Sequence, residues 1–256
     1  MNYKLFLPET PIIDNDDFVV YANPINISFS KDMMDYLLMK KQEILNFFGI
    51  DSFRKVQINI YDTKQGYMDF SSQFFTPSKY SKGNFANGML NLFVSERALE
   101  DENKYRYRMN TAAHEFVHIV YKEEVQEKGE NKRVVWLDEG LAEYLSGSYA
   151  NSTENVFKNF LLKQIIGPDK IIPNIEFLKE HGSEYGKFCD KETDKYNGYH
   201  LSYLMIRYLV ETMEKDDFQK MIRNKNLIEK IGENVLNDAV TCYSTQLEVD
   251  YELKRW

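Results

Sequence analysis

The chain has little cysteine and no excess of positive charge. Its two cysteines, Cys189 and Cys242, share no short spacing, which excludes a zinc finger or a disulfide framework. Lys and Arg number 32 and Asp and Glu number 40, so the net charge is -8. Nucleic-acid backbones and anionic membranes attract proteins with a basic surface. We therefore expect no nucleic acid and no membrane as a partner.

Long apolar runs are also missing. No stretch approaches the roughly 18 apolar residues that a membrane-spanning helix needs. The longest apolar run before Pro8 is three residues, so the N-terminus lacks the apolar core of a signal peptide. These features predict a cytoplasmic protein, with export that uses no cleaved signal as the alternative. A chain of 256 residues with 43% hydrophobic content can bury a full core.

The period of the apolar pattern changes along the chain. Before about residue 105 strand-like and helical segments alternate, and after it the pattern is helical almost throughout. This change predicts an α+β fold of one folding unit. Its N-terminal α/β sublobe would cover residues 1–104 and include an edge strand, and its helical catalytic sublobe would cover 105–256, with a cleft between them.

Individual elements follow from composition and spacing. Ser30 is expected as the N-cap of a helix that stops at Gly49, and a turn is expected at 83–87. Strands are predicted at 18–29, 55–62 and 88–94, and helices at 31–48, 67–75, 106–124, 137–149, 154–165, 174–180, 199–214, 217–230 and 234–254.

The segment around residue 115 carries a metal-binding pattern, because His114-Glu-Phe-Val-His118 has the form His-Glu-x-x-His. Positions four apart share one face of a helix, so two imidazoles can bind one Zn²⁺. Glu115 then projects beside the metal, where a bound water would lie. The alternative is a buried helix with two histidines that bind nothing. Chance is a poor explanation, since the chain has four histidines in all.

A catalytic zinc needs a third protein ligand and an open position. Glu139 lies twenty-one residues after His118, far enough for the chain to loop out and return as an antiparallel helix. Glu143, one turn later, is predicted to accept a hydrogen bond from a ligating imidazole, and Asp138 is a weaker candidate for such support. The alternative for these acids is a solvated helix face. Gly140 argues against it, because glycine inside a helix suggests that the helix backbone approaches the site closely.

With these residues in view, the chain resembles the gluzincin peptidases. The resemblance is to the aminopeptidase N and leukotriene hydrolase group and its smaller bacterial peptidase-MA-like relatives. It rests on the His-Glu-x-x-His segment and on Trp136-Leu-Asp-Glu139-Gly-Leu-Ala-Glu-Tyr144, and it covers about residues 30 to 256. It implies a thermolysin-like zincin fold, one zinc per chain and Glu139 as the third ligand.

The resemblance also implies a substrate-binding strand. The aminopeptidase branch has a Gly-Ala-Met-Glu-Asn motif whose acid holds the α-amine of the substrate. The matching residues here are Gly88, Met89, Leu90 and Asn91. Leu90 replaces the acid and cannot pair with an ammonium, which argues against an aminopeptidase. We expect this strand to bind an extended peptide through backbone pairing at its edge.

A tyrosine about sixty residues beyond the third ligand is the last implied feature. Tyr199, in Tyr-His-Leu-Ser, matches the family context, and its phenol would donate to the oxyanion of the tetrahedral intermediate. Tyr196 is the alternative, because it stands three residues earlier in a Tyr-x-Gly setting.

The sequence thus predicts a zinc-dependent metallopeptidase, with an endopeptidase favoured because the amine anchor is missing. Zinc would polarise the scissile carbonyl, and Glu115 would take a proton from water and pass it to the leaving amine. Its partner would be a peptide or protein substrate. The alternatives are another zinc hydrolysis, such as that of an epoxide, and a zinc-containing peptide-binding or regulatory module that does not cut.

Overall fold

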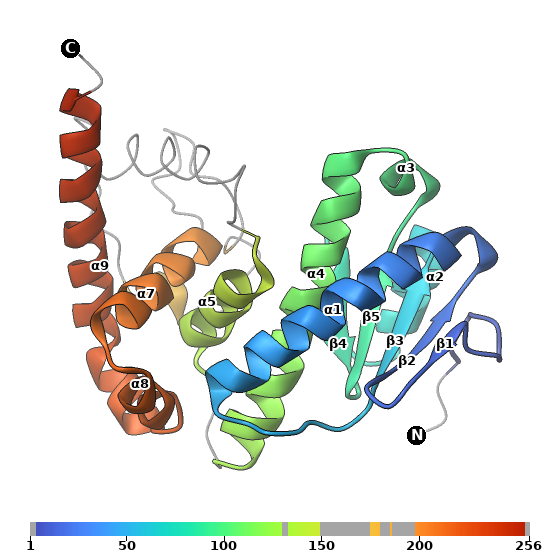
Figure 1. Ribbon diagram of the computed structural model, residues 1–256, viewed down its shortest axis with the longest axis horizontal. Helices are drawn as coiled ribbons and strands as arrows, with labels where there is room; N and C mark the ends of the chain where they lie inside the picture. Colours follow the sequence, from blue (N-terminus) through green and yellow to red (C-terminus); the bar gives the residue numbers. More distant parts are fainter. Residues whose placement is uncertain (1–3, 130–132, 149–174, 180–184, 186–197, 254–256) are drawn as a thin grey trace. The chain divides into compact units, whose positions relative to one another are not determined.

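A computed structural model describes residues 4–129, 133–148, 175–179, 185 and 198–253. The chain forms two compact units, Met1–Val120 and Tyr121–Trp256, and each is described by itself (Figure 1). The predicted division falls after residue 104, whereas the compact units divide after Val120. In the described residues no helix is long and apolar enough to cross a membrane.

The first unit contains a five-stranded mixed sheet with strand order β1-β2-β3-β5-β4, which confirms the mixed α/β character predicted for this part of the chain. The three inner strands run parallel, and the two outer ones are antiparallel to their neighbours. The strands are β1 (Ile13–Asp14), β2 (Phe18–Ala22), β3 (Val56–Tyr61), β4 (Gly83–Ala86) and β5 (Met89–Phe93).

One face of this sheet is apolar and packs against α1 (Ile27–Phe48) and α4 (Glu102–Tyr121). The ring of Phe18 on β2 lies edge-on to Phe116 of α4, with 5.6 Å between centroids, and both residues are fully buried. Tyr36 of α1 donates to Asn110 of α4 at 2.9 Å. Phe116 stands inside the His-Glu-x-x-His segment, so burial of its ring anchors that segment on the sheet.

The other face carries a row of asparagines covered by α2 (Lys64–Ser71). Asn59 and Asn91 are paired in the β3–β5 register, and the Asn59 amide donates to the Asn91 oxygen at 2.8 Å. Asn91 donates in turn to Asn84 of β4 at 3.1 Å, and Asn84 donates to Ser71 at 2.9 Å. Buried amides are costly unless they are hydrogen-bonded. The row therefore fixes β4 in register with the inner strands.

Three local predictions in this unit are wrong. The strand predicted at 18–29 ends at Ala22, because Pro24 opens a 3-10 turn (Pro24–Asn26) and has no N–H for strand pairing. Helix α1 then begins at Ile27, so Ser30 lies inside it, and its hydroxyl donates to the Asn26 carbonyl at 2.7 Å. The turn predicted at 83–87 is mostly strand β4. The reversal itself lies at Asn87 and Gly88, which both have positive φ.

The second unit is helical in its described residues. It begins with a π-helical turn (Lys122–Glu127), which follows α4 directly. Its other elements are α5 (Val135–Ser146), a 3-10 turn (Ile175–Leu178), α7 (Gly198–Thr212), α8 (Lys215–Ile222) and α9 (Lys225–Leu253). The short helix α3 (Glu96–Leu99) belongs to the first unit. The break between the last two helices falls at Asn224, not near 231–233 as the predicted bounds imply. The helix predicted at 154–165 lies outside the described residues.

Helices α5 and α7 pack closely at Gly140. A Cβ added there would lie 2.6 Å from Ile206 Cγ1 and closer still to the carbonyl of Ser202. Such distances require the backbones to move apart. Glycine at this position is explained by helix packing. The prediction that Gly140 reflects a close approach of the helix backbone to the site is replaced by this packing contact with α7.

Candidate metal centre

Helix α4 brings its two histidines together as their spacing predicts. The Nε2 atoms of His114 and His118 lie 3.0 Å apart. The His118 side chain is buried, and its ring centroid lies 5.7 Å from that of Phe85 on β4. The two rings are nearly perpendicular, so the nitrogens converge while the rings avoid stacking. The helical spacing and the contact with strand β4 thus fix the positions of the two imidazole rings.

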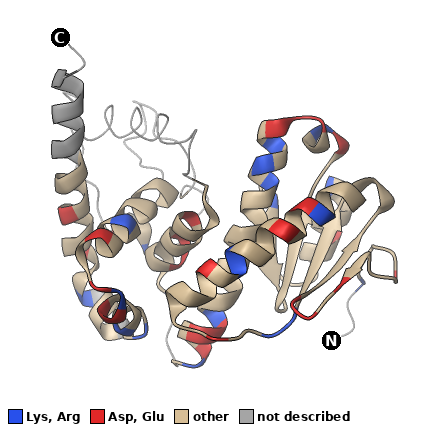
Figure 2. Cartoon of the chain, viewed as in Figure 1, with Lys and Arg blue, Asp and Glu red and all other residues tan. Residues whose placement is uncertain are grey.

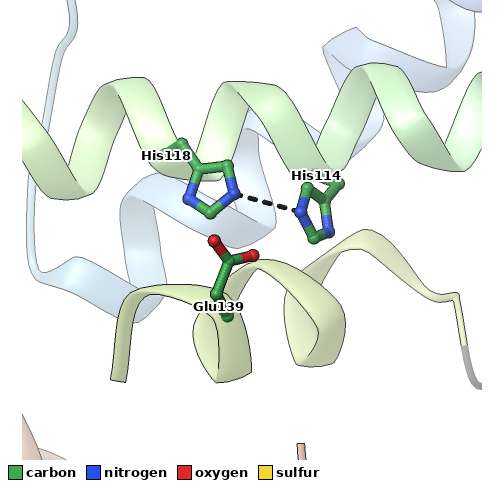
Figure 3. Close-up of side chains that lie close together, drawn as sticks. All are labelled: His114, His118 and Glu139. Atoms are coloured by element: carbon green, nitrogen blue, oxygen red, sulfur yellow. Dashed lines mark hydrogen bonds between the residues drawn. The ribbon is translucent and has the colours of Figure 1, made fainter. Parts of the chain in front are cut away.

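Glu139 completes a group of three possible metal ligands with His114 and His118. Each residue offers one nitrogen or oxygen atom, and these atoms all lie within 4.8 Å of one another. Figure 3 shows the carboxylate of Glu139 on α5 directed toward the two imidazoles. Glu139 is only 3% exposed, so the alternative of a solvated helix face is wrong for this acid.

The chemistry of this donor set fits zinc. Two imidazole nitrogens and one carboxylate oxygen are the ligands of many catalytic zinc sites, which keep a fourth position open. Two donors at about 2.0–2.1 Å from one ion can be at most about 4.2 Å apart. The 3.0 Å between the histidine nitrogens lies inside that limit, whereas the 4.8 Å that bounds all three donor atoms is slightly wider than it, so Glu139 fits by its donor type and proximity. His114, His118 and Glu139 are therefore the residues that would hold the ion.

Glu115 is buried against the start of strand β4. It is 8% exposed, and a Cβ added at Gly83 would lie 3.1 Å from both its Cγ and its Oε1. The same Cβ would lie 2.5 Å from Thr111 Cγ2, so glycine at position 83 leaves room for the side chains of both Thr111 and Glu115. Strand β4 is an edge of the sheet. The sequence predicted the role of Glu115 but not this contact with the edge strand.

Arg133 is a partner of Glu139 that no sequence pattern predicts. It forms ion pairs with Asp138 and Glu139, each at 2.5 Å. Burial lowers the pKa of Arg133, but the two carboxylates outweigh this effect and raise the pKa above its ordinary value. Charge-assisted bonds of this kind hold a carboxylate in a fixed orientation. Arg133 lies before the helix begins, so no helical spacing links it to these acids.

The remaining predicted acids have different surroundings. Asp138 is 2% exposed and is held by Arg133, whereas Glu143 is half-buried one turn further along α5. A hydrogen bond from either acid to a ligating imidazole stays a prediction.

Tyr199 lies in the first turn of α7, where its ring packs edge-on against Tyr185 at a centroid distance of 5.1 Å. Tyr185 was not anticipated. Its hydroxyl is 2.6 Å from that of Ser202, and burial, with a smaller contribution from Glu139, raises its pKa above the ordinary value. The alternative donor, Tyr196, lies outside the described residues. Burial lowers the pKa of His200 to about 4, so this imidazole is neutral at pH 7.

The predicted substrate strand needs a correction. Gly88 lies in the turn before β5, and Met89, Leu90 and Asn91 belong to β5, which pairs with β3 on one side and with β4 on the other. Met89, Leu90 and Asn91 are also buried. Their backbone therefore has no edge for a peptide, and the prediction of edge pairing through this strand is wrong. The edge on this side of the sheet is β4.

No protein-family model and no curated protein sequence matches the chain. The likeness to gluzincins therefore rests on the residues quoted above.

Proposed function

We propose that the chain is a zinc-dependent metallopeptidase of the gluzincin type, acting as an endopeptidase. The observation that carries the proposal is the convergence of donor atoms from His114, His118 and Glu139, with the acid Glu115 on the same helix as the histidines. A thermolysin-like zincin arrangement is part of this proposal. When bound, zinc supplies a Lewis acid for the scissile carbonyl and lowers the pKa of a coordinated water toward about 7.

Glu115 is the proposed general base. A carboxylate one residue after His114 and three before His118 projects from the helix near both imidazoles. It would accept a proton from the attacking water and deliver it to the leaving amine nitrogen. A Cβ added at Gly83 would lie 3.1 Å from the Glu115 carboxyl oxygen Oε1, so the proposed base lies beside the edge strand β4.

Strand β4 is the proposed docking edge for the substrate. One of its sides is hydrogen-bonded to β5, so an extended peptide can pair with its other side. Such pairing uses main-chain groups and needs no free amine. Leu90 cannot supply an amine anchor, because its side chain is apolar and fully buried. These features support internal cleavage over removal of N-terminal residues.

The proposal is tested with zinc-loaded protein and two kinds of substrate. Internally quenched peptides should be cleaved between internal residues, chelation should stop cleavage, and added zinc should restore it. Aminoacyl chromogenic substrates should be poor. Efficient release of N-terminal amino acids would overturn the endopeptidase assignment. Peptides that bind but stay intact would instead favour a zinc-containing binding module.

Tyr199 is the proposed oxyanion donor, and its change to Phe tests this role. The Tyr199→Phe variant should lower kcat by about 10²–10³ with KM and zinc content nearly unchanged, because the hydrogen bond forms mainly in the transition state. Steady-state kinetics of the purified variant measure the effect. Tyr196→Phe is the matched control and should be mild. The reverse ranking would transfer the role to Tyr196.

A further inference from the structure

Three basic side chains converge at the end of strand β5. The Nζ atoms of Lys64 and Lys82 lie 5.4 and 5.3 Å from the centroid of the Phe93 ring. Arg108 of α4 donates from Nε to the Phe93 carbonyl at 2.8 Å. All of these residues belong to the first compact unit. Like charges gathered in this way repel one another, so the arrangement needs an explanation.

The cluster occupies a position where α/β sheets commonly bind ligands. Phe93 is the last residue of β5, and Lys64 follows the end of β3, which runs parallel to β5. Ligands of open α/β sheets bind outside the carboxyl ends of such strands. Lys64 and Lys82 are only partly buried, so their ammonium groups remain within reach of a ligand. Arg108 is only 6% exposed, so it contributes a buried positive charge to the cluster.

No carboxylate neutralises these three residues within the part of the chain that the structure describes. Other basic residues of the same unit have acidic partners, as Lys41 has Asp17 and Arg106 has Glu102. Figure 2 shows basic residues gathered along the N-terminal half of α4, to which Arg108 belongs. In a chain with a net charge of -8, a basic group without acids marks a place where an anion is stabilised.

The titration of Lys64 agrees with this view. Burial lowers its pKa to about 8, and the charges of Lys82 and Arg108 add to the effect. Burial and the charge of Arg108 also lower the pKa of Lys82. A bound anion would offset this repulsion and raise both values.

The cluster is linked to Glu115 through β4. Lys82 is followed by Gly83, where an added Cβ would lie 3.1 Å from the Glu115 carboxyl group. Lys64 also lies 4.7 Å from the ring centroid of Tyr67, a residue whose pKa is raised by burial and further by the charge of Glu115. A ligand held by the lysines would therefore lie near the edge strand that begins beside the proposed base.

We propose that Lys64, Lys82 and Arg108 form an anion subsite that binds a carboxylate of the peptide substrate. The assignment of the anion to a substrate rests on the proposed function, whereas the subsite itself stands on the geometry of these three residues. The carboxylate has two possible sources in a peptide, the C-terminus and an Asp or Glu side chain.

Binding to the zinc-loaded full chain with Glu115→Gln tests the subsite without turnover. One labelled peptide is compared in four forms, with a C-terminal acid or amide and with Glu or Gln inside. We expect the form with the relevant carboxylate to bind about tenfold more tightly at low salt, and screening to reduce the difference. The pair of forms that differs identifies the source. The preference should fade as pH rises through about 8, because Lys64 loses its proton there and Lys82, whose pKa is also lowered, loses its proton below its ordinary range, while Arg108 stays charged and Tyr67 stays neutral.

Lys64→Gln with Lys82→Gln should remove the preference, and Lys31→Gln, an exposed lysine on α1, is the matched control. The change removes like charges but also the contacts of both lysines with the Phe93 ring and the hydrogen bond from Lys64 to the Ser81 carbonyl, so the melting temperature and circular dichroism of the variants must show a folded protein before affinities are compared. Equal affinity for all four forms would overturn the subsite, and so would a preference that survives the double change. Tighter binding of inorganic phosphate with no peptide preference would overturn the carboxylate assignment.

The two proposals can fail separately. If zinc-loaded wild-type protein cuts no peptide but still prefers the carboxylate form, the subsite stands and the peptidase function fails. If cleavage occurs with no such preference, the function stands and the subsite fails.

Discussion

Glu115→Gln is expected to lower kcat for peptide cleavage by about 10²–10⁴, the usual contribution of a general base. The amide has nearly the same size as the carboxyl group, so it can keep the contact with Gly83. It cannot accept the proton of water at neutral pH. KM should change little, because the lost interaction belongs to the transition state. Steady-state kinetics, together with zinc analysis of the same samples, measure both effects.

The matched control for this change is Glu102→Gln. Glu102 lies in the first turn of the same helix, is exposed, and pairs with Arg106 at 3.0 Å. Its replacement also removes one negative charge, but at the other end of the helix from the histidines. It should leave kcat within about twofold, because surface ion pairs contribute little to stability. Turnover of Glu115→Gln near the wild-type rate, at equal zinc content, would exclude Glu115 as the base.

The elements predicted most accurately are those whose signal is local. The inner strand β3 is predicted at 55–62 and spans Val56–Tyr61. The prediction succeeds because alternating apolar and polar residues indicate a strand with one apolar face. The approach of His114 to His118 follows from helical spacing alone. For Glu139 the sequence supplied the residue type and a loop of suitable length, and one of its carboxylate oxygens lies within 4.8 Å of a nitrogen of each histidine.

The features that were missed depend on contacts between distant segments. Strand β4 is short and contains Gly83 and Asn84, so its composition suggested a turn. It becomes a strand because β5 supplies its hydrogen bonds and Asn91 bonds its side chain. The basic cluster draws one residue from each of three segments. No spacing rule joins such residues, so only the fold reveals that their charges meet.

His118→Ala is expected to remove the metal and, with it, activity. The buried imidazole of His118 contributes one of three donor atoms, and two remaining ligands bind zinc poorly. Loss of a group that hydrogen-bonds to a metal ligand typically weakens metal binding by about 10–100-fold. Loss of a ligand itself should therefore weaken zinc binding by more than about 10²-fold. Elemental analysis should find about one zinc per wild-type chain and much less in the variant. Zinc should raise the melting temperature of the wild type only, since a ligand stabilises the state that binds it.

His181→Ala is the control for this change, because the sequence places His181 outside the ligand set while the substitution is chemically the same. It should keep its zinc. Removal of the buried His118 ring also takes away its contact with Phe85, so circular dichroism of metal-free wild type and variant must match before zinc loss is assigned to the ligand. Glu139→Gln gives an independent second test, because it changes one ligand with little change in volume. If zinc-loaded wild type and both variants retain the same metal content, the three residues do not form the zinc site and the proposed chemistry fails.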